Sequence, residues 1–278
     1  MAMFDWNGTT STELGKAYDW DGTTSTQLGK GYDWDGTTSS LVYNSQMTLD
    51  DITYTGTMEK INDGDGNWRV KLKTNGNLTF ATGGEIDVFL VGGGAGANFY
   101  GGGGGGYTLT KKGVSVSATT YSITIGTGGT GSNTKANNGT SSTAFGFTAS
   151  GGYGSTNSDW GSGGNGGGTG GNGGSGGGAC LEWNDGWSYT QTAGATDGNN
   201  AANASSKAGG KGQRSNPGPN GETGSTREFG ESSGTLYSAG GCGYRATATA
   251  TTANSGNGGN AINGTGCSGI VVIRNKRT

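Results

Sequence analysis

The sequence contains no histidine among its 278 residues. Imidazole is the usual general base and a common metal ligand near neutral pH, so its absence excludes His-dependent catalytic triads and most zinc-enzyme sites. The three cysteines, Cys180, Cys242 and Cys267, lie far apart and form no metal-ligand pair. We therefore expect buried, reduced thiols in a protein made in a reducing cytoplasm, and no bound metal or cofactor.

The chain also lacks targeting signals and blocks of like charge. Nothing after Met1 resembles a signal peptide, and no apolar run could cross a bilayer, so membrane insertion is not expected. Seventeen Lys and Arg stand against 20 Asp and Glu with no basic block, which argues against a nucleic-acid partner. If the protein works outside a cell, we expect it to leave by a route other than a cleaved leader.

Large apolar side chains are scarce, because Leu, Ile, Val and Phe together number 33 while glycine alone numbers 65. This shortage excludes a conventional hydrophobic core for the whole chain. A net charge of only -3 and 25 aromatic residues argue against a solvated, disordered chain. Collagen is excluded as well, because glycine is not in strict triplets and only Pro217 and Pro219 are prolines.

Glycine is most concentrated between residues 150 and 178. Within 161–178 the other residues recur at a spacing of three with one slip, at Ser162, Asn165, Thr169, Asn172 and Ser175. Three is the period of an extended, polyproline-II-like screw, whose bare glycine faces let neighbouring backbones bond laterally. The glycine blocks 92–96, 101–106, 209–212 and 256–259 are candidate neighbours. The predicted scaffold glycines are Gly101, Gly104, Gly163, Gly166, Gly170, Gly173 and Gly176.

Residues 4–45 contain three copies of a 14-residue unit, of which YDWDGTTSTQLGKG is the second. Each copy has a turn signal, such as Asp21-Gly22, between an aromatic segment and a Thr/Ser-rich segment. The pattern predicts a β-meander with Trp6, Trp20 and Trp34 on one face. A small meander is marginally stable alone, so we expect these repeats to serve attachment or oligomerisation.

The remaining strands are predicted from alternating apolar patterns. Residues 68–80 favour two strands across the turn Asn75-Gly76, and further strands are expected at 85–91, 107–109, 121–125, 143–150 and 268–274. The predicted fold is mostly β, with N-terminal β-repeats followed by a β-framed bundle of polyglycine-II-like helices and essentially no α-helix. The predicted regions are 1–49 (repeats), 50–85 (β linker) and 86–278 (glycine-rich domain).

The junction VFLVGGGAGA has the strand and glycines of a dinucleotide-binding fingerprint. That motif needs a helix whose N-terminus faces the pyrophosphate. Here Asn98-Phe99-Tyr100 and six more glycines follow, so no helix can start. Nucleotide binding is therefore disfavoured.

Five blocks occur in a fixed order from Ile86 to Arg274: IDVFLVGGGAGA, GGGGGGYT, YSITIGTGGTG, GTSSTAFGFTASGG and GCSGIVVIR. In this order they resemble the glycine-rich domain of tailed-phage fibre and tail-tip proteins. The YDWDGTTST repeats are similar to those that precede such domains in phage-derived proteins of gut bacteria. The resemblance implies a virion component, made in the bacterial cytoplasm and acting outside it, whose loops bind a host-surface glycan or protein receptor.

The leading hypothesis is a non-enzymatic receptor-binding protein of a phage tail fibre or tip. A glycine lattice offers a ligand few side chains, so recognition would lie in aromatic and Arg residues of the connecting loops. The candidates are Phe99, Tyr100, Tyr153, Trp160, Trp183, Trp187, Tyr189, Arg214, Arg227 and Phe229. Alternatively, Trp183 and Trp187 cap the glycine bundle as a small core.

Three further functions are less consistent with the sequence. A structural fibre subunit that forms filaments is the main alternative. Ice binding would need regular Thr rows, which residues 161–178 lack. A hydrolase is disfavoured because no pair of acids lies in a context that would separate their pKa values. Expected partners are other tail proteins, bound through the repeats, and further copies of the chain, with a trimer by analogy with fibres.

Overall fold

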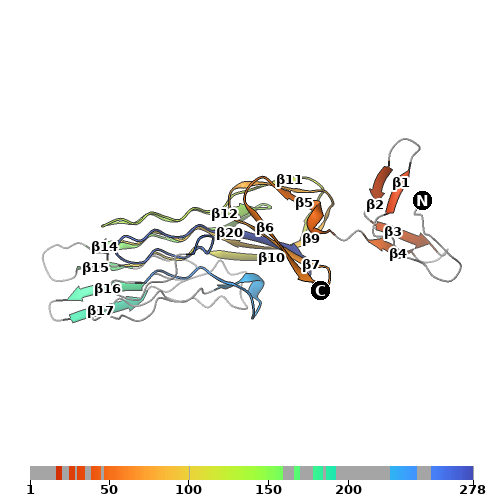
Figure 1. Cartoon of the computed structure of the whole chain (residues 1–278). Helices are drawn as coiled ribbons and strands as arrows, with labels where there is room; N and C mark the ends of the chain where they lie inside the picture. Colours follow the sequence, from red (N-terminus) through yellow and green to blue (C-terminus); the bar gives the residue numbers. More distant parts are fainter. Residues whose placement is uncertain are drawn as a thin grey trace.

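The computed structural model describes residues 47–99, 101–155, 226–242 and 252–277 with their side chains. Of other parts of the chain it describes the backbone of eight strands. These are β1 (Ala17–Trp20), β2 (Ser25–Leu28), β3 (Lys30–Trp34), β4 (Ser39–Asn44), β14 (Thr156–Ser158), β15 (Gly166–Thr169), β16 (Gly178–Trp183) and β17 (Gly186–Gln191). Figure 1 shows the arrangement.

The second and third N-terminal repeats each contribute a β-hairpin. Strand β1 pairs with β2, and β3 pairs with β4, and in each case the Asp-Gly pair lies between the two strands in the sequence. The predicted continuous meander is wrong for the described strands, because the two hairpins form separate sheets. Only residue 29 separates β2 from β3, which is too short for the two-residue loop of a tight hairpin. Trp6 lies outside the described residues, and Trp20 and Trp34 end β1 and β3.

A five-stranded antiparallel sheet forms one layer of the main body. Its order is β10 (Thr108–Val116), β9 (Gly84–Val91), β20 (Ile270–Asn275), β7 (Asn67–Leu72) and β6 (Met58–Gly64). The last strand of the chain thus lies at the centre of the sheet. The strands predicted at 85–91 and 268–274 are confirmed.

A three-stranded sheet, β11 (Thr120–Ile123), β8 (Gly76–Phe80) and β5 (Ile52–Tyr54), forms a second layer. Both strands predicted within 68–80 exist, but a hairpin between them is wrong, because β7 and β8 belong to different sheets. The remaining elements are the pair β12 (Ser142–Ala144) and β13 (Phe147–Ala149), the pair β18 (Thr226–Arg227) and β19 (Leu236–Tyr237), and the 3-10 turns η1 (Leu49–Asp51) and η2 (Glu228–Gly230).

The larger core lies between these two sheets. It buries alternate residues of β9, such as Ile86 and Val88, against Leu78 and Phe80 of β8. The intervening residues Phe89 and Val91, with their β20 counterparts, form a second core on the opposite face of the five-stranded sheet. Both faces of β9 and β20 are therefore covered, which explains their almost continuous apolar sequence. Because β5 to β8 belong to these sheets, the sheets cross the boundary predicted at residue 85.

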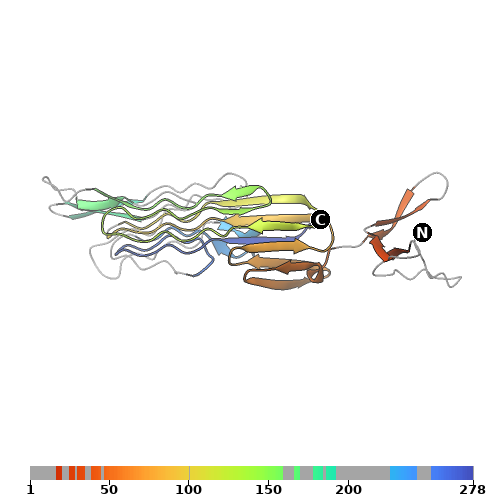
Figure 2. The ribbon, with the colours of Figure 1, turned by 90° about the horizontal axis from the view of Figure 1, so that it is seen from above.

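Beyond the five-stranded sheet the described chain runs out and back in glycine-rich stretches, here called the glycine segments (Figures 1 and 2). They comprise residues 92–98, 101–107, 126–132, 136–141, 150–155, 238–242, 255–260 and 264–269. Segment 92–98 continues β9 and is almost entirely buried. Three of the glycine blocks predicted as neighbours, 92–96, 101–106 and 256–259, thus lie side by side.

The hydrogen bonds of segment 92–98 repeat every three residues. Its N–H groups donate in turn to segments 101–107, 136–141 and 264–269, through Gly92 to Tyr107, Gly93 to Thr140, Gly94 to Cys267, Ala95 to Gly104, Gly96 to Asn137 and Ala97 to Gly264. Its carbonyl groups accept hydrogen bonds from the N–H groups of three other segments. The donors are Gly152 and Ser155 of segment 150–155, Gly129 and Ser132 of segment 126–132, and Gly259 of segment 255–260. One segment thus bonds to six neighbours, and the glycines leave room for these backbones to approach closely.

The glycine-rich run of 150–178 differs from the prediction in its described middle part. Gly166–Thr169 forms β15, which pairs in antiparallel ladders with β14 and β16. A ladder on both edges satisfies these backbone groups within one sheet, so a three-residue period is not needed there. Gly163, Gly170, Gly173 and Gly176 lie outside the described residues. The described chain is mostly β and contains no α-helix, as predicted.

Candidate functional site

Three chain reversals lie at the end of the glycine segments farthest from the five-stranded sheet, and we call them the distal turns. Residues 98–101 join the segment leaving β9 to the one entering β10. Residues 132–136 and 261–263 join two further pairs of segments in the same way. Since all three follow segments that bond to one another, they converge on one end of the bundle.

Asparagine side chains cross-link the distal turns. The Asn98 side chain accepts from the N–H of Gly101 at 2.6 Å and donates to the Thr134 carbonyl at 3.3 Å. The N–H of Asn98 donates to Ser155 Oγ at 2.5 Å. The Asn263 amide donates to the Asn133 side chain. These contacts hold residues distant in sequence in a fixed relation.

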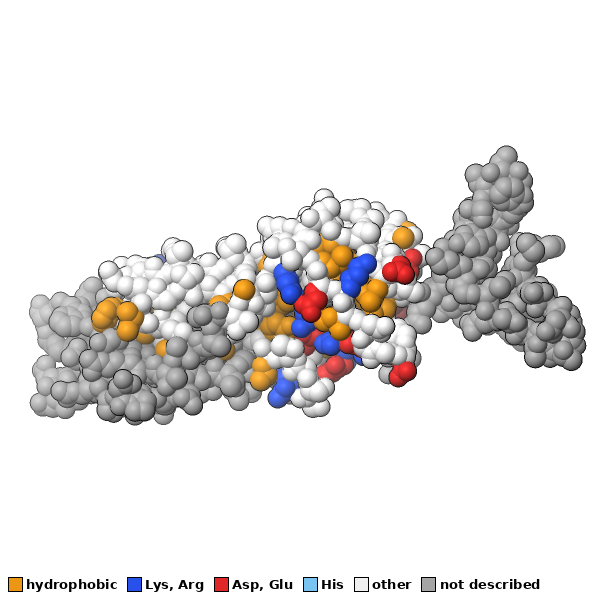
Figure 3. Space-filling view, viewed as in Figure 1, with side chains coloured by type: hydrophobic (Ala, Val, Ile, Leu, Met, Phe, Trp, Pro, Cys, Tyr) orange, Lys and Arg blue, Asp and Glu red, His pale blue; other side chains and the backbone are white. Residues whose placement is uncertain are grey.

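Charge is almost absent from the described glycine segments and distal turns. Lys135 is the single charged residue of the glycine segments and distal turns. In Figure 3 the acidic and basic side chains gather over the sheets, while the glycine-rich part is mostly white with a hydrophobic patch toward its distal end. The described distal surface therefore offers amides, hydroxyls and a few apolar groups to a ligand.

Of the predicted receptor residues, Phe99 and Tyr153 lie in or beside this region. Phe99 is half-buried in the first distal turn. Tyr153 is 51% exposed in a neighbouring segment, and its ring meets that of Tyr107 edge-on, with centroids 6.3 Å apart. The Tyr153 ring is therefore open to a ligand on its exposed side, while its contact with Tyr107 holds it on the other.

Three further aromatic candidates lie in a four-stranded sheet formed by β14 to β17. Trp187 and Tyr189 are in β17, where Trp187 is in register with Glu182, and Trp183 ends β16 opposite Gly186. Tyr100, Trp160 and Arg214 lie outside the described residues. Whether the two tryptophans bind a receptor or form a cap stays a prediction.

Arg227 and Phe229 lie instead on the sheets, in a stretch of residues 226–237 that we call the strap. Phe229 is 4% exposed and packs on Phe89, with ring centroids 5.9 Å apart. Arg227 donates to the carbonyl of Gly234 within the strap. Phe229 is thus a core residue and not part of an exposed loop, because it fills the second core of the five-stranded sheet.

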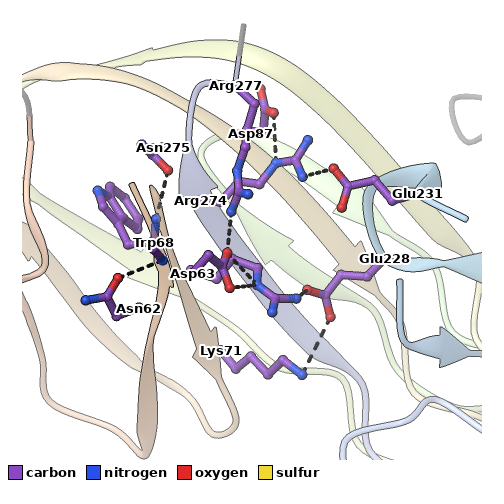
Figure 4. A network of polar contacts seen from close by, with 12 residues as sticks. Asn62, Asp63, Trp68, Lys71, Asp87, Glu228, Glu231, Arg274, Asn275 and Arg277 are labelled. Carbon is purple, nitrogen blue, oxygen red and sulfur yellow. Dashed lines mark hydrogen bonds and ion pairs between the residues drawn. The ribbon is translucent and has the colours of Figure 1, made fainter. Parts of the chain in front are cut away.

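Ionic contacts fasten the strap to the sheet (Figure 4). Arg274 pairs with Asp87 at 3.0 Å, where both side chains are 3% exposed, and also with Glu231. Its guanidinium lies 4.1 Å from the centroid of the Phe229 ring. The buried carboxylate of Glu228 accepts from Arg69 at 2.6 Å.

Neighbouring groups extend this network. Lys71 lies 3.6 Å from Glu228, and the Tyr237 hydroxyl donates to the same carboxylate at 3.0 Å. Burial, together with the Glu228 charge, raises the pKa of Tyr237, so this hydroxyl keeps its proton. The arrangement pairs carboxylates with cations, and its role is to hold the strap.

Two further observations concern the described residues. They contain no group of three His, Cys, Asp or Glu side chains that could hold a metal, and no helix among them could span a membrane. Cys242 and Cys267 are buried, as predicted, and burial raises the pKa of the Cys267 thiol.

The sequence predictions missed Ile262, which at 59% is the most exposed large apolar side chain of the described structure. Asn263-Gly264 signals a turn there, but the predicted receptor residues are all aromatic or Arg side chains. A lone isoleucine beside a turn signal would have been the only indication.

No curated protein matches this chain. Residues 72–276, which are more than half of the sequence, match the family model described as a glycine-rich domain. The match covers the five-stranded sheet from the end of β7 onward, the glycine segments and the strap. The chain therefore belongs to the glycine-rich domain family.

Proposed function

We propose that this protein is a receptor-binding component of a phage tail fibre or tail tip, without catalytic activity. In this proposal the glycine segments are polyglycine-II-type helices, and their bundle is a rigid carrier for the distal turns. The observation that supports it best is the convergence of three turns, at 98–101, 132–136 and 261–263, on one cross-linked surface.

A close-packed backbone bundle suits this role for a physical reason. Each segment is held by hydrogen bonds on several sides, so a turn at its end has little freedom to move. A preorganised surface loses less conformational entropy when it binds a partner. The N-terminal hairpins, which pair with no strand of the main body in the described structure, are free to attach to other tail proteins.

The main alternative, a subunit of an open filament, is less well supported. One edge of the five-stranded sheet is β6, which carries Glu59 paired with Lys73 at 2.7 Å. The other edge, β10, is interrupted by a bulge between Lys111 and Val114. Charges and bulges at sheet edges oppose strand addition by another copy.

Two measurements test the proposal. Fluorescently labelled full-length protein is mixed with intact cells of a panel of gut bacterial isolates, and binding is followed by flow cytometry. We expect saturable binding to a subset of isolates. Electron microscopy of the same protein should show discrete particles. Open filaments together with no binding to any isolate would favour the structural alternative.

A further inference from the structure

Both the solvent exposure and the backbone conformation of Ile262 are unfavourable for an isoleucine. Its side chain is 59% exposed, and its backbone φ is 69°, in the left-handed region. A β-branched residue is a rare outlier there, whereas glycine and asparagine adopt this conformation readily. Neither the strain nor the exposure contributes to folding.

The surrounding contacts keep the turn in this conformation. The N–H of Ile262 donates to the Phe99 carbonyl at 3.0 Å, and that of Asn263 donates to the Asn98 carbonyl at 3.2 Å. On either side, the N–H of Ala261 donates to the Cys242 carbonyl and the N–H of Gly264 donates to the Asn260 carbonyl, each at 2.9 Å. The isoleucine therefore projects from a fixed backbone. Strained positions of this kind cluster at ligand-binding sites.

The neighbourhood of Ile262 indicates the chemistry of the partner. A branched aliphatic group has no aromatic face to stack on a sugar ring, and it gains affinity by burial in an apolar pocket. An anionic glycolipid would require several Lys or Arg side chains, whereas Lys135 is the one charged residue of the described distal turns and segments. Both points favour a protein, and not a glycan or a glycolipid, as the binding partner.

We propose that Ile262 is an anchor residue that inserts into an apolar pocket of a protein on the host cell. This inference rests on the proposed function and specifies the class of receptor. Phe99, half-buried beside the same turn, would extend the contact. Because the contact is apolar, binding should change little with ionic strength.

The test compares Ile262→Asn with Leu236→Asn in the full-length protein. Leu236 is also an exposed apolar residue, 38% exposed, but it lies in the strap on the sheets. The probe is an isolate that binds the wild-type protein, used as intact cells, as protease-shaved cells and as periodate-oxidised cells. We expect Ile262→Asn to reduce binding at least tenfold with an unchanged or higher Tm, and Leu236→Asn and Ile262→Val to bind like the wild type. Shaved cells should lose binding and oxidised cells should retain it.

Other outcomes would overturn the inference in distinguishable ways. If the wild type binds cells and Ile262→Asn binds equally well, the anchor is refuted while the proposed function stands. Loss of binding after periodate but not after protease would identify a glycan receptor. A lower Tm in Ile262→Asn would make the residue structural. Failure of the wild type to bind any isolate would refute both proposals.

Discussion

Gly94 shows at the scale of one residue why the central part of this protein must be glycine. A Cβ placed there would lie 1.9 Å from the carbonyl oxygen of Asn257, a backbone atom that cannot move without displacing its own segment. Gly128 has the same relation to Gly266, at 1.8 Å. The sequence made a glycine lattice predictable, but not which glycines are innermost, because the six neighbours come from separate parts of the chain.

Substitution of Gly94 by alanine should destabilise the protein strongly. The clash forces segments apart, and overpacking typically lowers the free energy of unfolding by about 1–3 kcal/mol, with larger values in rigid surroundings. We expect the upper end of this range in chemical denaturation. Gly84→Ala is the matched control, because its Cβ would meet only the Met47 side chain at 3.4 Å. Equal stability of the two variants would show that the lattice adapts easily.

Asp63 gives a residue-scale prediction on acid stability. Burial raises the pKa of its carboxyl, but hydrogen bonds from Arg69 and Arg277 outweigh burial and lower it overall. A lowered pKa means that the ionised form stabilises the fold above the unfolded-state pKa of about 4. This contribution is lost as the pH falls through the folded-state pKa. The Tm of Asp63→Asn should therefore lie below that of the wild type at pH 7 and converge with it in strong acid. A constant difference down to acid pH would contradict the assignment.

The strap is an element whose packing on the sheet could not be predicted from the sequence. Phe229 has a positive φ of 54° and lies between Phe89 and the guanidinium of Arg274. No local pattern predicts this position, because it depends on partners far away in the sequence. An aromatic residue in a polar, glycine-rich stretch was therefore interpreted as a loop residue.

Phe229→Ala should accordingly act on stability. Loss of a buried phenylalanine typically lowers the free energy of unfolding by about 3–5 kcal/mol. We expect a change of this order in urea denaturation, with faster tryptic cleavage after Arg227 as the strap loosens. Unchanged stability with lost binding to cells would restore the original interpretation of Phe229 as a receptor residue.

Strand β20 gives a second prediction at the scale of elements. Its apolar sequence made the strand predictable, and its central place between β9 and β7 was not, because pairing depends on the whole sheet. Deleting residues 270–278 removes that centre and leaves Asp87 without Arg274. We expect no cooperative unfolding transition in circular dichroism. Deletion of residues 1–44 is the control, and it should leave the transition intact, since β1 to β4 pair with no strand of the main body in the described structure.

At the scale of the whole molecule, different kinds of interaction stabilise different parts of the described structure. The ion pairs and both apolar cores belong to the sheets, the glycine segments consist largely of backbone, and polar turns form the distal end. The sequence predicted β strands that frame a glycine-rich bundle with distal loops, because glycine blocks alternate with apolar strands along the chain. It did not predict which turns meet, since that follows from lateral bonds between segments far apart in the chain, such as the bond from Gly94 to Cys267.

The orientation of the bound protein tests the central claim most directly. Protein with a gold label at its N-terminus is bound to membrane vesicles from an isolate that it recognises, and the label is located by electron cryotomography. If the distal turns contact the receptor and the N-terminal repeats attach to the tail, the label will stand away from the membrane. Labels that lie against the membrane would contradict this account.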